Sequence, residues 1–130
     1  MNKEGIKLWV DALRSGQYEQ GGGALRPTPG QFCCLGVACE VAIQNGINLV
    51  RVEDGYKDPD RPGSHYSGAM PEVVVKWLGL EGDERQAAGD LRMFLDPSDA
   101  ESICTELAQF NDVWNLDFNK IAHIIEGNLL

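Results

Sequence analysis

Residues 31–46 read Gln-Phe-Cys-Cys-Leu-Gly-Val-Ala-Cys-Glu-Val-Ala-Ile-Gln-Asn-Gly, and this stretch decides the fold. Glu40 is its only charged residue, so apolar and small residues occupy every side of a helix drawn through it. A helix that is apolar all round is typically buried inside its domain. Asn45-Gly46 supplies the left-handed residue that commonly ends a helix. The sequence therefore predicts a central buried helix from Phe32 to Asn45.

Further helices are predicted on both sides of this stretch. Over residues 3–15 the apolar residues recur at i, i+3, i+4 and i+7, which is typical of an amphipathic helix. Asn2 is a suitable N-cap for it and Gly16 a suitable stop. Three more helices are predicted. One follows Pro71 and ends at Gly79, and another begins at the capping box Ser98-Asp99-Ala100-Glu101. The last runs from Asp117 to Gly127.

Short extended segments are predicted between the helices. Residues 18–20 and 24–26 flank the triple glycine Gly21-Gly22-Gly23 and are expected to pair around it. Residues 47–52 have the composition of a strand, and residues 64–67 are its expected partner across a polar loop. The predicted fold is one α+β domain over residues 1–130, mainly helical, with about four helices around the central one and one or two short β-hairpins.

The charge of the chain is unevenly distributed. Twenty acidic and eleven basic residues give a net charge of −9. Residues 1–26 carry a net +1, whereas residues 81–130 carry a net −8. Because binding of a nucleic-acid polymer requires Lys and Arg to neutralise phosphates, this balance argues against such a partner. The acidic C-terminal half suits a solvated surface or contact with a basic protein.

The sequence carries no sign of a membrane or of an oxidising compartment. The residues after Met1 lack an apolar signal region, and no run approaches the ~18 apolar residues of a membrane span. We therefore expect a cytoplasmic protein. In that compartment cysteines stay reduced, so the four cysteines are expected as free thiols, namely Cys33, Cys34, Cys39 and Cys104.

The N-terminal segment holds the candidate ligand-binding residues. A glycine-rich loop lets backbone amides approach a phosphate, arginine can bind phosphate with two hydrogen bonds, and tyrosine offers a ring for stacking. No Lys-Ser/Thr follows the glycines, so the loop is not a Walker motif. A helix end with solvated arginines is the alternative. The predicted ligand-binding residues are Arg14, Tyr18, Gln20, Gly21, Gly22 and Arg26, with His65 and Tyr66 at the rim.

A cysteine nucleophile is an alternative reading of the central helix. A thiol at a helix N-terminus has a lowered pKa because the helix dipole stabilises its thiolate. Cys34 is the candidate, and His65 is its better partner as general base. The competing interpretation is that the cysteines are small core residues, since cysteine is often buried. Adjacent cysteines make poor chelate geometry, so no metal and no cofactor are expected.

Several motifs together resemble a known group of phage proteins. The matching pieces run in order along most of the chain: Trp-Val-Asp-Ala-Leu-Arg-Ser-Gly-Gln-Tyr-Glu-Gln-Gly (9–21), Phe-Cys-Cys-Leu-Gly-Val-Ala-Cys (32–39), Met-Pro-Glu-Val (70–73), Trp-Leu-Gly-Leu (77–80) and parts of 107–122. They are similar to a family of small acidic proteins of tailed bacteriophages, especially of actinobacteriophage type. The resemblance implies the cytoplasm of an infected bacterial host and, by itself, no activity.

These observations support one functional hypothesis and leave two alternatives open. We expect a non-catalytic binding protein that sequesters a small phosphorylated ligand, a nucleotide-type immune signal of the host, and so acts as an anti-defence sponge. The first alternative is an inhibitor that binds a host protein through the acidic C-terminal half. The second is a cysteine-dependent hydrolase. A homodimer is the default expectation for the assembly, because two-fold dimers are the commonest oligomers.

Overall fold

The computed structural model describes residues 2–80, 111 and 116–130 of the chain, and the structural statements below concern these residues. They form four helices and two small two-stranded sheets, so the fold is α+β and mainly helical. The predicted helix that begins at Ser98 lies outside the described residues, as does Cys104.

Helix α1 (Lys3–Arg14) forms where the amphipathic pattern predicts it. The side chain of Asn2 accepts a hydrogen bond from the backbone N–H of Gly5 at 3.0 Å and so caps the first turn. Beyond the helix, Gly16 adopts a left-handed φ of 77°, which glycine reaches without steric cost. The apolar face is buried, and its members are Ile6, Trp9, Val10 and Leu13.

Helix α2 (Cys34–Gln44) forms within the apolar stretch. Every residue from Cys34 to Ala42 is buried, including Glu40. The helix begins two residues later than predicted, because Phe32 belongs to strand β2 (Gln31–Phe32) and Cys33 is the N-cap. The indole N–H of Trp9 donates a 2.9 Å hydrogen bond to the carbonyl oxygen of Cys34 and ties α1 to the start of α2.

The predicted hairpin around the triple glycine is wrong. Strand β1 (Glu19–Gln20) instead pairs in parallel with β2, in the register Glu19 opposite Gln31. Residues 24–26 form no strand, and the Leu25 N–H donates to the carbonyl oxygen of Ser67 at 2.6 Å. Pro27 and Pro29 follow directly and have no N–H to donate to a ladder, so the chain loops before it pairs.

The second sheet is shorter than predicted and has a different partner. Strand β3 (Val50–Val52) pairs antiparallel with β4 (Gly55–Lys57), which falls inside the predicted polar loop. Residues 64–67 contribute a single antiparallel bridge, in which Tyr66 pairs with Tyr56. Gly55 allows this close approach, because a Cβ there would overlap the carbonyl oxygen of Tyr66.

The last two helices begin close to their predicted starts. Helix α3 (Glu72–Leu78) follows Pro71 and ends at Gly79, whose φ is 70°. Helix α5 (Phe118–Leu129) begins at Asp117, whose carboxylate accepts a hydrogen bond from the Lys120 N–H at 2.8 Å. It continues two residues beyond the predicted end, because a glycine is tolerated within a helix at a modest cost.

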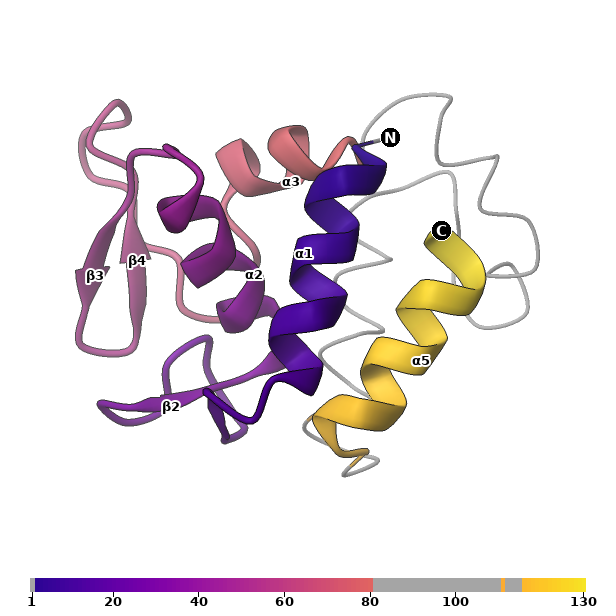
Figure 1. Ribbon diagram of the computed structural model, residues 1–130. Coiled ribbons are helices and arrows are strands. Elements are labelled where there is room, and N and C mark those ends of the chain that lie inside the picture. Colours follow the sequence, from indigo (N-terminus) through magenta and orange to yellow (C-terminus); the bar gives the residue numbers. More distant parts are fainter. Residues whose placement is uncertain (1, 81–110, 112–115) are drawn as a thin grey trace.

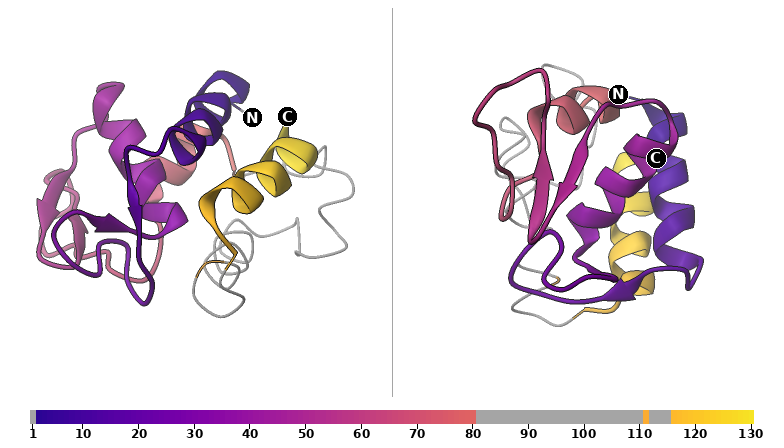
Figure 2. Two further views of the ribbon diagram at one scale, coloured as in Figure 1. Left: turned by 60° about the horizontal axis from the view of Figure 1, so that its bottom comes forward. Right: turned by 90° about the vertical axis from the view of Figure 1, so that its left-hand side faces the viewer.

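The elements lie side by side in the order hairpin β3–β4, α2, α1 and α5 (Figure 1). Helix α1 contacts α2, α3 and α5, and so connects the two sides of the molecule. Figure 2 shows the hairpin covering the side of α2 that faces away from α1. Within the described residues, no helix has both the length and the apolar character needed to cross a membrane.

Candidate ligand-binding site on helix α2

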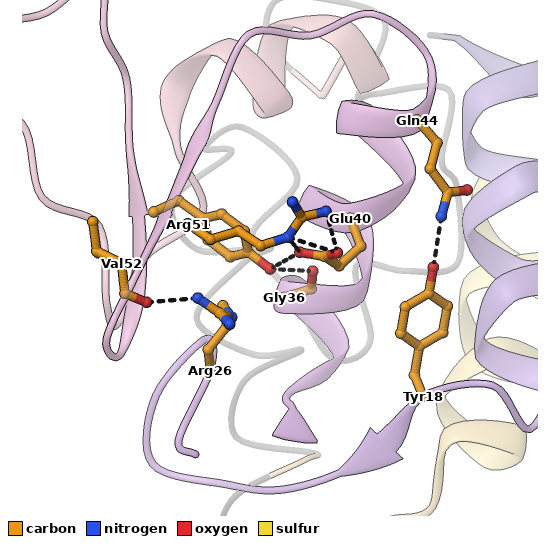
Figure 3. Close-up of polar contacts among 8 residues, drawn as sticks. Tyr18, Arg26, Gly36, Glu40, Gln44, Arg51 and Val52 are labelled. Carbon is orange, nitrogen blue, oxygen red and sulfur yellow. Dashed lines mark hydrogen bonds and ion pairs between the residues drawn. The ribbon is translucent and has the colours of Figure 1, made fainter. Parts of the chain in front are cut away.

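Three residues of α2 spaced by four positions, Gly36, Glu40 and Gln44, lie on one face of the helix. This face is covered by polar side chains from the N-terminal loop and the β3–β4 hairpin (Figure 3). We call the resulting surface the α2 polar face. It consists of Gly36, Glu40 and Gln44 together with Tyr18, Arg26, Arg51 and Tyr56.

A buried carboxylate lies at the centre of the α2 polar face. The side chain of Glu40 is 8% exposed, and Arg51 from β3 donates to both of its oxygens at 2.8–3.1 Å. The hydroxyl of Tyr56 donates to Glu40 Oε2 at 2.7 Å and has the Gly36 carbonyl oxygen 3.2 Å away. These bonds satisfy a charge that would otherwise be costly to bury.

The contacts with Glu40 contribute to raising the pKa of both Arg51 and Tyr56. The hydrogen bond to Glu40 raises the pKa of Arg51, which therefore stays charged. The pKa of Tyr56 is raised far above its usual range, first by burial and then by Cys39 and by the hydrogen bond to Glu40. The centre of the face thus holds one anion, one cation and a neutral phenol.

Arg26 is the described arginine whose guanidinium has no carboxylate partner. Its Nη1 donates to the Val52 carbonyl oxygen at 2.6 Å, and its Cζ lies 5.9 Å from the centroid of the Tyr56 ring. Its Nε is buried and has no hydrogen-bond partner. By contrast, the other described arginines, Arg14, Arg51 and Arg61, each pair with a glutamate. A positive charge without a carboxylate partner is suited to an anionic ligand.

Tyr18 marks the other end of the α2 polar face. Its hydroxyl accepts a hydrogen bond from the Gln44 amide at 3.1 Å, and its ring meets Phe32 edge-on with centroids 5.4 Å apart. Tyr18 also contributes to raising the pKa of Arg51, after the larger effects of Glu40 and Tyr56. The eight positions from Gly36 to Gln44 correspond to about 12 Å along a helix. The α2 polar face therefore extends along about two turns of the helix.

Arg14 does not belong to this site, which corrects the predicted convergence of Arg14, Tyr18 and Arg26. Its guanidinium forms two hydrogen bonds with Glu126 of α5, at 2.8 and 3.2 Å. Helix α5 lies on the opposite side of α1 from the hairpin that Arg26 contacts (Figure 1). The two arginines were close in the sequence, but they lie on different sides of the molecule.

Two predicted residues of the glycine loop, Gln20 and Gly21, form hydrogen bonds within the protein. Gln20 Nε2 donates to Asn111 Oδ1 and to the Leu116 carbonyl oxygen, both at 2.8 Å. The carbonyl oxygen of Gly21 accepts from Asn111 Nδ2 at 2.8 Å, and its N–H donates to Phe32 at 2.9 Å. Gly22, the next predicted residue of the loop, is exposed. Gln20 and Gly21 therefore connect the N-terminal loop to Asn111 and Leu116.

His65 and Tyr66 are linked to Arg26 through Asp54 and Tyr56. The Arg26 N–H donates to the Asp54 carbonyl oxygen at 3.2 Å, and the Asp54 carboxylate lies 2.7 Å from His65 Nε2. The backbone of Tyr66 pairs with that of Tyr56, whose ring lies under Arg26. These links connect His65 and Tyr66 indirectly to Arg26, whereas Tyr18 contacts Gln44 at the other end of the α2 polar face.

The cysteine alternative finds little geometric support. Cys34 is 0% exposed, so a substrate has no route to its sulfur in this structure. The imidazole of its expected base, His65, is engaged with Asp54, and 54% of the His65 side chain is exposed. Cys33 and Cys39 are also buried. Among the described residues, no group of three or more His, Cys, Asp or Glu side chains is arranged to hold a metal ion.

Sequence reasoning missed Arg51, Tyr56 and Gln44. One signal for them was present, because Glu40 is the only charge in an otherwise apolar helix and a buried carboxylate needs a partner. A buried carboxylate implies that a cation or a hydroxyl lies next to it. The sequence does not identify which of many residues supplies that group.

Comparison with known proteins places the chain in a family. A family model described as a domain of unknown function, DUF8296, matches residues 1–129. No curated protein and no solved structure matches the chain significantly. Because the match extends over nearly the whole sequence, this chain belongs to the DUF8296 family.

Proposed function

We propose that this protein is a non-catalytic binding protein that holds a small phosphorylated ligand of nucleotide type on the α2 polar face. The observation that carries the proposal is the guanidinium of Arg26, which has no carboxylate partner among the described residues. Its Nη1 donates to the Val52 carbonyl oxygen, and its Nε is buried without a hydrogen-bond partner among those residues. A phosphate oxygen is a suitable acceptor for it, since arginine binds phosphate through charge-assisted hydrogen bonds.

Each part of the ligand has a matching group in this proposal. The phosphate lies against Arg26, next to the half-exposed Arg51 and with His65 at the rim. The ring of the ligand lies toward Tyr18, whose aromatic side chain is only partly buried. The Glu40–Arg51–Tyr56 contacts hold the wall of the site in place, because they join α2 to both strands of the hairpin.

The resemblance to proteins of tailed bacteriophages supports a biological setting for this activity. In the cytoplasm of an infected bacterium, a small protein that sequesters a nucleotide signal acts as an anti-defence sponge without catalysing any reaction. The burial of Cys34 agrees with a non-catalytic role.

Isothermal titration calorimetry against a panel of nucleotides and cyclic nucleotides tests the proposal. We expect at least one member to bind, and Arg26→Ala to weaken its binding by about 1.5–3 kcal/mol, the range for hydrogen bonds to charged groups. Tyr18→Ala is expected to cost about 1–3 kcal/mol if the ring stacks on a base, whereas Tyr18→Phe retains the ring and most of the affinity.

Arg14→Ala is the matched control, because it removes an arginine whose partner, Glu126, lies on α5. It should leave ligand affinity unchanged. Circular dichroism checks that each variant is folded, since Arg26 also bonds Val52. The proposal fails if no panel member binds, or if Arg14→Ala weakens binding as much as Arg26→Ala.

A second candidate function, binding of a basic host protein, is supported by the charge distribution. Residues 81–130 carry a net −8, whereas residues 1–80 carry a net −1. Such an asymmetry favours electrostatic attraction of a cationic surface and makes it sensitive to salt. A pull-down from host lysate at low and high ionic strength tests this candidate, which predicts a specific partner that high salt releases.

A further inference from the structure

The charges of the α2 polar face are nearly balanced, and this restricts the ligand that the proposed function requires. Two guanidinium groups, those of Arg26 and Arg51, lie at the face. Glu40 compensates the charge of Arg51 through three hydrogen bonds at 2.8–3.1 Å. One positive charge, that of Arg26, is therefore left for the ligand.

Carboxylates border the place where the ligand's anionic group lies. The Asp54 backbone accepts from the Arg26 N–H, and its side chain lies against His65 at the rim. Glu53, the neighbour of Asp54 in the turn, is exposed. A second or third negative charge on the ligand would face the carboxylates of Asp54 and Glu53, and like charges at short range repel.

The far end of the face provides groups for an uncharged ring. Gln44 is exposed and uses one amide proton to reach Tyr18, which leaves its amide oxygen and its second proton available. Such an amide can accept from and donate to the edge of a base. The face therefore offers the charge of Arg26 at the hairpin and neutral hydrogen bonding at Gln44, near the C-terminal end of α2.

From this arrangement, and resting on the proposed function, we infer that the ligand presents its phosphate as a singly charged phosphodiester, as in a cyclic nucleotide, and that the site rejects polyphosphates. Arg26 neutralises the one charge of the diester, and the Asp54 carboxylate sets the limit on further negative charge.

A series with one base and different phosphate charge tests this inference. Calorimetry at constant ionic strength and mildly alkaline pH compares 3′,5′-cyclic AMP, AMP and ATP, and then the guanine counterparts. We expect the cyclic monoanion to bind at least about tenfold more tightly than the triphosphate of the same base, with the monophosphate between them.

Asp54→Asn makes the test specific to the proposed charge limit. The substitution keeps the size and a hydrogen-bonding oxygen beside His65 but removes one negative charge. It should raise the affinity for ATP several-fold and that for the singly charged cyclic nucleotide by less. Asp11→Asn is the matched control, since Asp11 is exposed on α1 and contributes to the charge environment of Arg14 instead.

The outcomes separate this inference from the function on which it rests. If ATP binds as tightly as the cyclic nucleotide, or if Asp54→Asn and Asp11→Asn change the ATP affinity equally, the inference is overturned while nucleotide binding stands. If none of the probes binds, the proposed function itself fails. A cyclic nucleotide that is preferred, with a preference that Asp54→Asn reduces, supports both.

Discussion

Glu40 and Arg51 form an ion pair that joins a core helix to a surface strand, and the two ends of the pair have different environments. The carboxylate side chain is 8% exposed and the guanidinium side chain 48% exposed. Water can therefore solvate Arg51 without its partner, but cannot solvate Glu40. The ion pair therefore stabilises Glu40 more than Arg51. A charged carboxylate inside the protein requires the hydrogen bonds from both Arg51 and the Tyr56 hydroxyl.

Arg51→Ala should destabilise the protein for this reason. It leaves the buried Glu40 carboxylate with Tyr56 as its remaining hydrogen-bond donor among the contacts described above. We expect the free energy of unfolding to fall by about 1–3 kcal/mol, the cost of a buried polar group that loses a partner. Chemical denaturation monitored by tryptophan fluorescence measures it. Arg14→Ala is the control and should change stability little, because both members of its pair with Glu126 are solvent-accessible. Equal losses in the two variants would contradict the burial argument.

Tyr56 should make the protein sensitive to alkali. Burial, Cys39 and the hydrogen bond to Glu40 raise its pKa in the folded state, whereas an unfolded tyrosine ionises near its ordinary pKa of about 10. Because the folded pKa is the higher one, the stabilising effect is fully present below about pH 10 and is lost as the pH rises above it. Denaturation at a series of alkaline pH values should show this decline. Tyr56→Phe, which cannot ionise, should have a shallower decline, and an unchanged slope would show that Tyr56 is not its source.

Gly36→Ala should disturb the packing of α2 against the N-terminal loop. A Cβ at this position would overlap the carbonyl oxygen of Leu25, which is also the acceptor for the Cys33 N–H. We expect a loss of about 1–3 kcal/mol in unfolding free energy, as for other overpacked positions. The matched control is Gly127→Ala in α5, where no atom of the described residues lies within 4 Å of the added Cβ. There, alanine should stabilise the helix by about 0.5–1 kcal/mol. The idea is wrong if both substitutions stabilise.

Asn111→Ala should destabilise the protein, because Asn111 connects the C-terminal part of the chain to Gln20 and Gly21. Asn111 is 4% exposed, accepts from Gln20 and donates to the carbonyl oxygen of Gly21. Its removal leaves buried polar groups unsatisfied, so we expect a loss of about 1–3 kcal/mol in thermal or chemical unfolding. A cycle with Gln20→Ala should give a non-additive total, since the two side chains share a hydrogen bond. The exposed Asn119 provides a neutral control as Asn119→Ala, and additivity in the cycle would count against the network.

The secondary structure was predictable where local signals are strong. The buried face of α1, its cap at Asn2 and the cap of α5 at Asp117 all lie where the sequence places them. Each depends on residues within one or two turns of the same helix, so the pattern along the chain contains the information. The strands were less predictable. Strands β1 and β2 have two residues each, and their pairing depends on how the intervening loop folds rather than on their own composition.

The candidate site was predictable only in part, because its residues come from distant parts of the chain. Tyr18, Arg26, His65 and Tyr66 were named from the sequence, and the structure links His65 and Tyr66 indirectly to Arg26, whereas Tyr18 contacts Gln44. Arg14 was named for the same reason as Arg26, namely a position in the net-positive segment. Nothing local distinguishes two such arginines, and their environments differ because different elements meet them in the folded chain.

The sequence by itself determined the helical character of the chain, the apolar nature of α2 and the presence of one carboxylate, Glu40, in that helix. These properties follow from side chains close to one another along the chain. The tertiary structure decided which charges are compensated. It pairs Arg14 with Glu126, 112 positions away, and leaves Arg26 against the ring of Tyr56. The physical reason is that compensation depends on distance in space, which packing alone sets, and so the free charge that defines the candidate site emerges only when the chain has folded.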